Sequence, residues 1–274
     1  FVTTIQPLMK ELKSRGIKVI ANAGGVNPSA CRAALVAAAR AEGVYFWTPE
    51  GKRYLDFNSQ LMCSNIGHSH PKVVKAIQEQ AARLAYANPF MATEPRARLG
   101  AKLAEITPGD IDVFFFTNGG AEANENAVRM ARLVTGRHKI LARYRSYHGG
   151  TGTSLTMTGD PRRWAMEPGM PGIIHVPHPH HGLQRGTDSG ADALAQLEEI
   201  IMLEGPQTIA GFILETVTGT NGLHLPPDGY LEGIRALCTK HGILLICDEV
   251  MSGFGRTGEW FAVDHWKVVP DILT

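Results

Sequence analysis

Two acidic side chains of this sequence each follow a short apolar run. Asp248 comes after Ile243–Cys247, and Glu215 comes after Ile209–Leu214. A carboxylate at the end of a buried strand needs a cationic or hydrogen-bonding partner. Beside a heterocyclic nitrogen such a carboxylate can keep that nitrogen protonated and make the ring an electron sink. We predict that Glu215 orients neighbouring groups by hydrogen bonding. Considered alone, either acid is also consistent with a helix cap or a solvated strand end.

A glycine-rich turn is a candidate anion site. The segment Asn118-Gly119-Gly120-Ala121-Glu122-Ala123-Asn124 lies between a predicted strand and a predicted helix. The first turn of a helix leaves backbone N–H groups free for an anion, and glycine lets the backbone approach a phosphate closely. Gly and Asn are also common in ordinary strand–helix connections, which is the alternative for this turn.

An aromatic turn, Tyr147-His148-Gly149-Gly150, follows another apolar run. The face of Tyr147 can stack on a flat cofactor ring in an offset geometry. The alternative is a core tyrosine beside a tight turn.

These residues need elements that bring them together. From residue 113 onward, short apolar runs alternate with segments of helical spacing. The predicted strands are Val113–Thr117, Lys139–Arg143, Gly172–Val176, Ile209–Leu214 and Ile243–Cys247. The predicted helices are Ala121–Leu133, Ala191–Leu203 and Tyr230–His241. The pattern predicts an α/β fold with a mainly parallel sheet covered by helices on both faces, and such sheets bind ligands beyond the carboxyl ends of their strands.

The first part of the chain is organised differently. The predicted elements are a helix over Pro7–Arg15, a hairpin of Val44–Trp47 with Arg53–Phe57, and helices over Lys72–Leu84 and Pro95–Ile106. The pattern changes near residues 57–70. We predict that residues 1–60 contribute to a small domain and that residues 61–274 form the large domain.

Composition excludes several classes of function. The 274 residues are 44% apolar and 19% charged, as in globular proteins, and the net charge of +1 gives no basic footprint for nucleic acid. No apolar run approaches the roughly 20 residues that span a bilayer, and the start of the sequence is unlike a signal peptide. The widely spaced Cys31, Cys63, Cys238 and Cys247 predict reduced thiols and a cytoplasmic location.

Two further patterns are weaker. Gly253-Phe-Gly255-Arg-Thr-Gly258 has the spacing of a dinucleotide-binding loop, but it does not open a helix after the first strand, as that site requires. His175, His178, His180 and His181 resemble a metal-binding tract, but the prolines between them restrict wrapping and no other ligand motif accompanies them. We predict no metal site.

Taken in order, the motifs resemble those of the class III aminotransferases, which use pyridoxal 5′-phosphate (PLP). The similarity runs from about Gly43 to Thr274 and includes a Gly-His-x-His-Pro turn at residues 67–71 and the segment from Asp248 to Gly258. Gly119 and Ala121 stand where the family commonly has hydroxyl residues, so we predict a weaker side-chain grip on the phosphate. Thr216 stands where the family commonly has proline after the strand-end Glu.

The resemblance implies PLP fold type I, with a seven-stranded, mainly parallel sheet and a small domain built from both chain ends. It implies a homodimer with shared active sites, and a lysine beyond Thr274 that binds PLP covalently. Val250 is expected on the ring face opposite Tyr147. The residues implied to bind PLP are Gly119, Gly120, Ala121, Tyr147, His148, Glu215, Asp248 and Val250.

The implied reaction moves an amino group from an ω-amino acid or amine to a keto acid such as pyruvate, with Asp248, Tyr147 and Glu215 as catalytic residues. The region around Met62 lines the substrate entrance in the family. Together with Ala87–Phe90, it resembles the ω-amino acid:pyruvate branch. The same fold serves decarboxylases, racemases and aminomutases, which differ in their dependence on an amino acceptor. A chain that truly ended at Thr274 would lack the lysine and would be a non-catalytic fragment.

Overall fold

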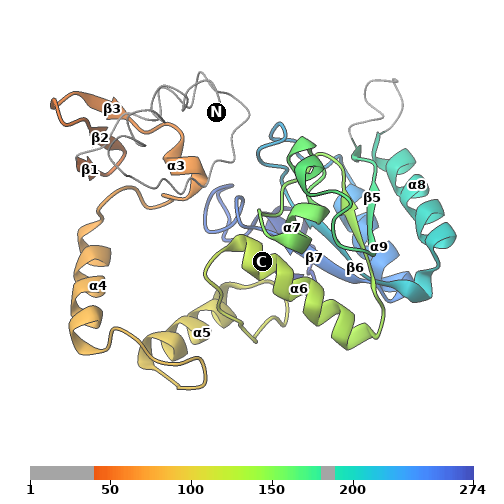
Figure 1. The fold of residues 1–274 in the computed structure, drawn as a ribbon, viewed down its shortest axis with the longest axis horizontal. Helices are drawn as coiled ribbons and strands as arrows, with labels where there is room; N and C mark the ends of the chain where they lie inside the picture. Colours follow the sequence, from red (N-terminus) through yellow and green to blue (C-terminus); the bar gives the residue numbers. More distant parts are fainter. Residues whose placement is uncertain (1–39, 180–188) are drawn as a thin grey trace. The chain divides into compact units, whose positions relative to one another are not determined.

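The computed structural model describes residues 40–179 and 189–274 (Figure 1). Contacts between Cα atoms divide the chain into two compact units, Phe1–Tyr86 and Ala87–Thr274. The assignment of residues 1–60 to a small domain stays a prediction. The predicted helix Pro7–Arg15, Cys31, His180 and His181 lie outside the described residues.

The described part of the first unit begins with an antiparallel sheet. Its strands β1 (Arg40–Glu42), β2 (Tyr45–Trp47) and β3 (Arg53–Leu55) pair in the order β1-β2-β3, which confirms the predicted hairpin. The ring of Phe46 stacks on that of Tyr54 across the hairpin, with 5.3 Å between centroids. Two helices follow, α3 (Ser59–Met62) and α4 (Pro71–Arg83), and α4 matches the predicted helix Lys72–Leu84.

The second unit contains the predicted parallel sheet. Five parallel strands pair in the order β5-β4-β6-β7-β8. They are β4 (Lys139–Arg143), β5 (Ile173–Val176), β6 (Ile209–Glu215), β7 (Leu244–Asp248) and β8 (Ile272–Leu273). The first four match the predicted strands to within one residue at each end. β8 was not predicted, because two residues show no periodicity.

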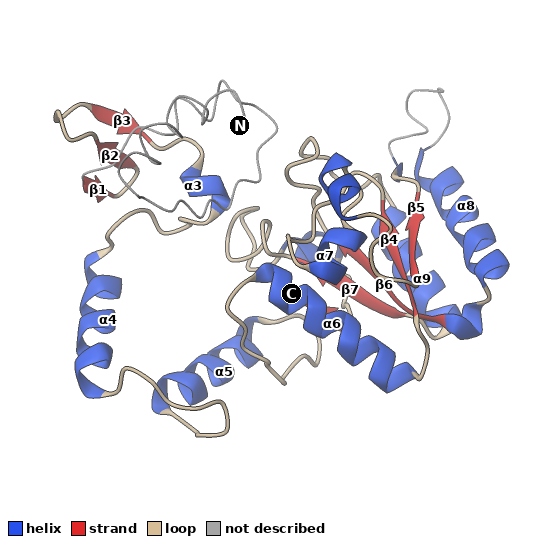
Figure 2. Cartoon of the chain, viewed as in Figure 1, coloured by secondary structure: helices blue, strands red, loops and turns tan. Residues whose placement is uncertain are grey.

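Helices cover both faces of this sheet (Figure 2). On one face, α6 (Gly120–Thr135) and α7 (Gly152–Met157) pack against alternate strand residues that include Ile140, Ala142, Ile213 and Ile246. On the other, α8 (Ser189–Glu204) and α9 (Tyr230–His241) pack against Leu141, Phe212, Leu214 and Leu245. Because both faces are buried, the strands appear in the sequence as continuous apolar runs.

One predicted strand is wrong. Val113–Thr117 forms no strand, and the side chains of Val113 and Phe115 are 86% and 59% exposed. A strand needs a neighbour to complete its ladder of hydrogen bonds, and this run has none among the described residues. The sheet therefore has five strands in the described part of the chain, whereas the resemblance implied seven.

The remaining elements are short, except α5 (Glu94–Ile106), which matches its prediction. In the described part of the chain, the 3₁₀ helices η1 (Pro161–Met166), η4 (Pro206–Thr208) and η5 (Ala262–Trp266) lie in the connections and were not predicted. The Gly253–Gly258 segment forms turns, with Phe254 N donating to Trp260 O at 2.6 Å. Among the described residues, none of the helices combines the length and the apolar character that a membrane crossing needs.

Arg137 joins several chain segments where β4 begins. Its Nη1 lies 3.3, 3.1, 3.1 and 2.8 Å from the carbonyl oxygens of Pro206, Ile209, His241 and Gly242. The carbonyls at the end of a helix have no intrahelical donor. One guanidinium therefore satisfies acceptors from η4, β6 and the end of α9.

We expect Arg137→Ala to lower the free energy of unfolding by about 2–3 kcal/mol, because the carbonyl groups lose a charged donor. Urea unfolding followed by circular dichroism measures the change. As a control, Arg129→Ala removes an exposed arginine whose Nη2 donates to Asn126 Oδ1 one turn earlier; its effect should stay within about 0.5 kcal/mol. Equal midpoints for both variants would contradict this role for Arg137.

Candidate active site

The predicted site residues of the second unit lie where strands β4, β6 and β7 end and where α6 begins (Figure 2 labels these elements). Asp248 ends β7 and Glu215 ends β6, and the parallel register places the two residues side by side. Tyr147 and His148 lie in the loop that follows β4, and Gly119 immediately precedes α6. The carboxyl edge of the sheet thus brings together four segments that are far apart in the sequence.

Three hydrogen bonds hold the Asp248 carboxylate in the interior. Its Oδ2 accepts from Asn124 Nδ2 and from His148 Nδ1, each at 2.8 Å, and its Oδ1 accepts from Val250 N at 3.0 Å. Asp248, His148 and Asn124 are 4%, 2% and 1% exposed. These donors offset the desolvation of the acid. Since a carboxylate oxygen can accept two hydrogen bonds, Oδ1 has capacity for one more donor.

The same network orients the His148 ring. A carboxylate only accepts, so Nδ1 is assigned as the protonated nitrogen that donates to Asp248. Asn124 Nδ2 also donates to the His148 carbonyl at 2.8 Å. The other ring nitrogen, Nε2, is buried and has no hydrogen-bond partner among the described residues. An unsatisfied buried polar atom requires an explanation, and a ligand-binding or catalytic site is one.

Glu215 lies beside Asp248 in different surroundings. Its Oε1 accepts from Tyr147 N and its Oε2 from Gly219 N, both at 2.8 Å. Burial raises the pKa of the Glu215 carboxyl above its usual range. The negative charge of Asp248 raises this pKa further, whereas His148 and the two backbone N–H groups oppose the rise. The carboxyl of Glu215 therefore holds its proton to a higher pH than an ordinary glutamic acid.

The glycine turn forms a narrow cradle at the start of α6. A Cβ atom on Gly120 would lie 2.6 Å from Val250 Cγ2, and one on Gly149 would lie 2.4 Å from Ala121 Cβ. No side chain caps α6, whose N-cap residue is Gly119, so the N–H groups of its first turn are available to an anion. The predicted residues Gly120, Ala121 and Val250 are thus brought together.

Sequence reasoning missed three residues of this arrangement. Thr274 Oγ1 donates to Asn124 Oδ1 at 2.7 Å, and the Arg162 guanidinium lies over the Tyr147 ring. Asn124 had a signal, since it begins a buried stripe on α6 that continues through Ala127, Val128 and Ala131. A polar residue in such a stripe needs a buried partner. Arg162 had none, because η1 shows no periodicity in the sequence.

The remaining predicted residues are Met62 and the histidine tract. Met62 ends α3 in the first unit, half-buried and with φ of 63°, and its contact with substrate stays a prediction. The His175 ring stacks on Tyr144 at 5.0 Å between centroids, and His178 Nε2 lies 3.2 Å from Thr218 Oγ1. The described part of the chain contains no group of three or more potential metal ligands.

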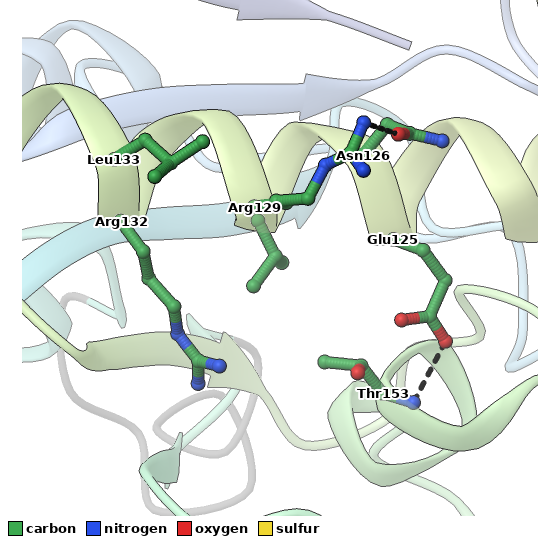
Figure 3. Close-up of a pocket in the computed structure, with 7 residues that line it drawn as sticks. Glu125, Asn126, Arg129, Arg132, Leu133 and Thr153 are labelled. Carbon is green, nitrogen blue, oxygen red and sulfur yellow. Dashed lines mark hydrogen bonds between the residues drawn. The ribbon is translucent and has the colours of Figure 1, made fainter.

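A separate groove of about 360 Å³ runs along α6 (Figure 3). It is lined by Glu125, Asn126, Val128, Arg129, Arg132, Leu133 and Thr153. Glu125 Oε1 accepts from Thr153 N at 2.7 Å, which joins α6 to the first turn of α7. None of the predicted site residues lines this groove.

Comparison with known proteins gives two matching family models. The model described as "Aminotransferase class-III" matches residues 27–274. A second model, described as "Acyclic terpene utilisation family protein AtuA", matches residues 1–49 only.

Individual relatives agree with the first model. The chain is 40% identical over 247 residues to an omega-aminotransferase of Caulobacter vibrioides, covering 85% of this chain and 56% of that protein. A crystal structure of taurine:2-oxoglutarate aminotransferase from Bifidobacterium kashiwanohense, in complex with PLP and glutamate, superposes with a TM-score of 0.84 at 43% identity, covering 98% of this chain and 60% of that one. An (S)-enantioselective omega-transaminase from Thermomicrobium roseum gives a TM-score of 0.85 at 40% identity, covering 98% and 62%. The chain therefore spans less than two thirds of the length of these relatives.

The raised pKa of Glu215 predicts that Glu215→Gln gains stability relative to the unsubstituted protein as the pH rises above 4.5. A carboxyl whose folded pKa exceeds its unfolded value of 4.5 keeps a proton that the unfolded chain has released, so folding weakens as the pH rises between the two values. Glutamine does not titrate. Urea titrations at several pH values measure the difference, with Glu259→Gln as a control for the loss of one exposed charge. A difference independent of pH would contradict the assignment.

Proposed function

The chain belongs to the class III aminotransferase family, and on that premise we propose that the protein is a PLP-dependent transaminase. It moves an amino group from an ω-amino acid or amine to a keto acid such as pyruvate. The observation that carries the proposal is the buried Asp248 carboxylate, which is held by Asn124 and His148 and keeps one acceptor position on Oδ1.

The residues around Asp248 fit PLP. Oδ1 of Asp248 would accept a hydrogen bond from the protonated ring nitrogen, and the N–H groups of Gly120 and Ala121 would bind the phosphate. Tyr147 and Val250 would contact the two ring faces. Val250 is 57% exposed although it is apolar, and it lies against Gly120, which supports this placement. When bound, PLP supplies an electron sink.

The protein's own residues keep these groups in place. Asn124 and His148 fix the Asp248 carboxylate and keep it desolvated without leaving it unsatisfied. Glu215 fixes the backbone of Tyr147 through Oε1, and its raised pKa suits a group that carries a proton or orients one. A desolvated, preorganised site of this kind strengthens each electrostatic interaction within it.

The names of the relatives support the proposed substrate class. One is an omega-aminotransferase, and another is a taurine:2-oxoglutarate aminotransferase, so 2-oxoglutarate is a second candidate acceptor beside pyruvate. Met62 remains the candidate residue at the substrate entrance. We further propose a homodimer with shared active sites in the cytoplasm, where the free thiols of Cys63, Cys238 and Cys247 would stay reduced.

The function is tested on the full-length protein loaded with PLP. ω-Amino acids and amines are offered with pyruvate or 2-oxoglutarate, and alanine or glutamate is quantified. We expect transfer that requires both substrates, and Asp248→Asn should slow it about 100- to 1000-fold, as when one preorganised electrostatic group is removed. Consumption of the amino compound without a keto acid would point instead to a decarboxylase, racemase or aminomutase. Absence of PLP-dependent transfer with every pair would sink the proposal.

Gly119 and Gly120 provide a matched test of phosphate binding. A Cβ on Gly119 meets nothing within 4 Å, whereas one on Gly120 would collide with Val250. We expect Gly119→Ser to tighten PLP binding about 2- to 10-fold, because a hydroxyl adds one hydrogen bond. Gly119→Ala should change little, and Gly120→Ala should weaken binding about 10-fold or more through overpacking. Titration of the apoprotein with PLP, followed by fluorescence, gives the affinities. Identical affinities for the Ser and Ala variants at residue 119 would place the phosphate elsewhere.

A further inference from the structure

We propose that Arg162 is a positioning residue for the Tyr147 ring, which it holds from the face turned away from the cofactor. The inference rests on the proposed function, since it takes the Tyr147 ring to stack on PLP. It adds a residue that lies outside the set predicted from the sequence.

The contact is a cation–π interaction. Arg162 Cζ lies 3.9 Å from the centroid of the half-buried Tyr147 ring. At this distance the planar guanidinium is attracted to the negative face of the aromatic ring. Because one ring face is covered by Arg162, a second flat ring can stack only on the other face.

Asp160 fixes the guanidinium in this place. Arg162 Nε lies 3.0 and 2.9 Å from the two carboxylate oxygens of Asp160, and Nη2 also donates to Oδ2. Asp160 is buried, and burial alone would raise the pKa of its carboxyl, but hydrogen bonds from Arg162 and Asn221 outweigh burial and leave this pKa below its ordinary value. The acid is therefore charged at neutral pH and pairs with Arg162 in a bidentate geometry.

Three consecutive residues after β6 connect the Asp160–Arg162 pair to Glu215. Gly219 N donates to Glu215 Oε2 at 2.8 Å, Thr220 Oγ1 accepts from Arg162 Nη2 at 2.8 Å, and Asn221 Nδ2 donates to Asp160 Oδ2 at 3.1 Å.

Glu215 in turn accepts from Tyr147 N. The loop at residues 219–221 thus contacts both groups that hold Tyr147, one at its backbone and one at its ring. If Arg162 served only to neutralise the Asp160 carboxylate, it would not need the additional hydrogen bond to Thr220 in this loop.

The next residue offers a matched control. Arg163 lies in the same 3₁₀ helix, with Cζ 5.5 Å from the Tyr144 ring centroid and Nε 3.1 Å from Glu167 Oε1. Tyr144 is exposed and is not among the proposed site residues. The two arginines therefore share their element and chemistry, and they differ in the tyrosine that they cover and in the acid that they pair with, buried Asp160 for Arg162 and exposed Glu167 for Arg163.

The test uses the full-length protein and measures PLP affinity in the apoprotein and the circular dichroism of the bound cofactor. We expect Arg162→Met to weaken PLP binding about 3- to 30-fold, the range of a partly desolvated cation–π contact, and to reduce the cofactor signal. The PLP affinity of Arg162→Lys should lie between that of Arg162→Met and that of the unsubstituted protein, because lysine keeps the charge but lacks the planar guanidinium. Arg163→Met should bind PLP within about 2-fold of the unsubstituted protein.

Milder and competing outcomes are also informative. Thr220→Val removes one hydrogen bond from Arg162 and should weaken PLP binding about 2- to 3-fold without unfolding the protein. Unchanged PLP affinity and cofactor signal in Arg162→Met would overturn the positioning role, as would a variant in which only the KM for the amino donor rises. Failure of the unsubstituted protein to bind PLP would overturn the proposed function itself.

Discussion

The burial of one carboxylate constrains the whole site. Asp248 ends β7, an apolar strand between β6 and β8 of the parallel sheet, where a buried ionised group is stable only if donors surround it. Its donors come from α6 through Asn124, from the loop after β4 through His148, and from its own chain through Val250 N. Thr274, just beyond β8, joins the same network through Asn124. The requirement to satisfy this acid therefore fixes the start of α6 against three strand ends.

Glu215, which lies beside Asp248 at the carboxyl edge of the sheet, has different hydrogen-bond donors. Glu215 is the register partner of Asp248, and its carboxylate oxygens accept from the backbone N–H groups of Tyr147 and Gly219. Asp248 accepts from a side-chain amide and an imidazole as well as from one backbone N–H group. Two buried negative charges side by side repel each other. Burial and this repulsion by Asp248 raise the pKa of Glu215. Adjacent acids with different hydrogen-bond donors are the arrangement expected of a site in which the two groups have different roles.

Much of this could be predicted from the sequence because the signals are local. Buried parallel strands such as Lys139–Arg143 are continuous apolar runs, and the carboxyl edge then follows from the fold class. Val113–Thr117 has the same local signal and forms no strand, since pairing depends on a neighbour that the run itself cannot specify. Asn124 carried a signal in its place on a buried stripe. Arg162 carried none, because its role depends on Asp160, Thr220 and Tyr147 meeting in space.

The composition of the glycine turn affects what the rest of the site must do. Gly119 and Ala121 stand in place of hydroxyl residues, so an anion at the start of α6 would meet backbone donors. Backbone donors bind a phosphate, but they would restrict the orientation of an attached ring less than side-chain contacts from several directions. Orientation of a flat ring must then come from the groups along its edges and faces. In the proposed function, Asp248 would constrain one edge of the cofactor ring, and Tyr147 would constrain a face only if its own ring is held. In this chain the Tyr147 backbone is bound by Glu215 and its ring is covered by Arg162, and the loop at residues 219–221 contacts both of these groups. In the proposed function, a tyrosine held at its backbone and its ring would therefore compensate for a phosphate cradle built from glycine and alanine.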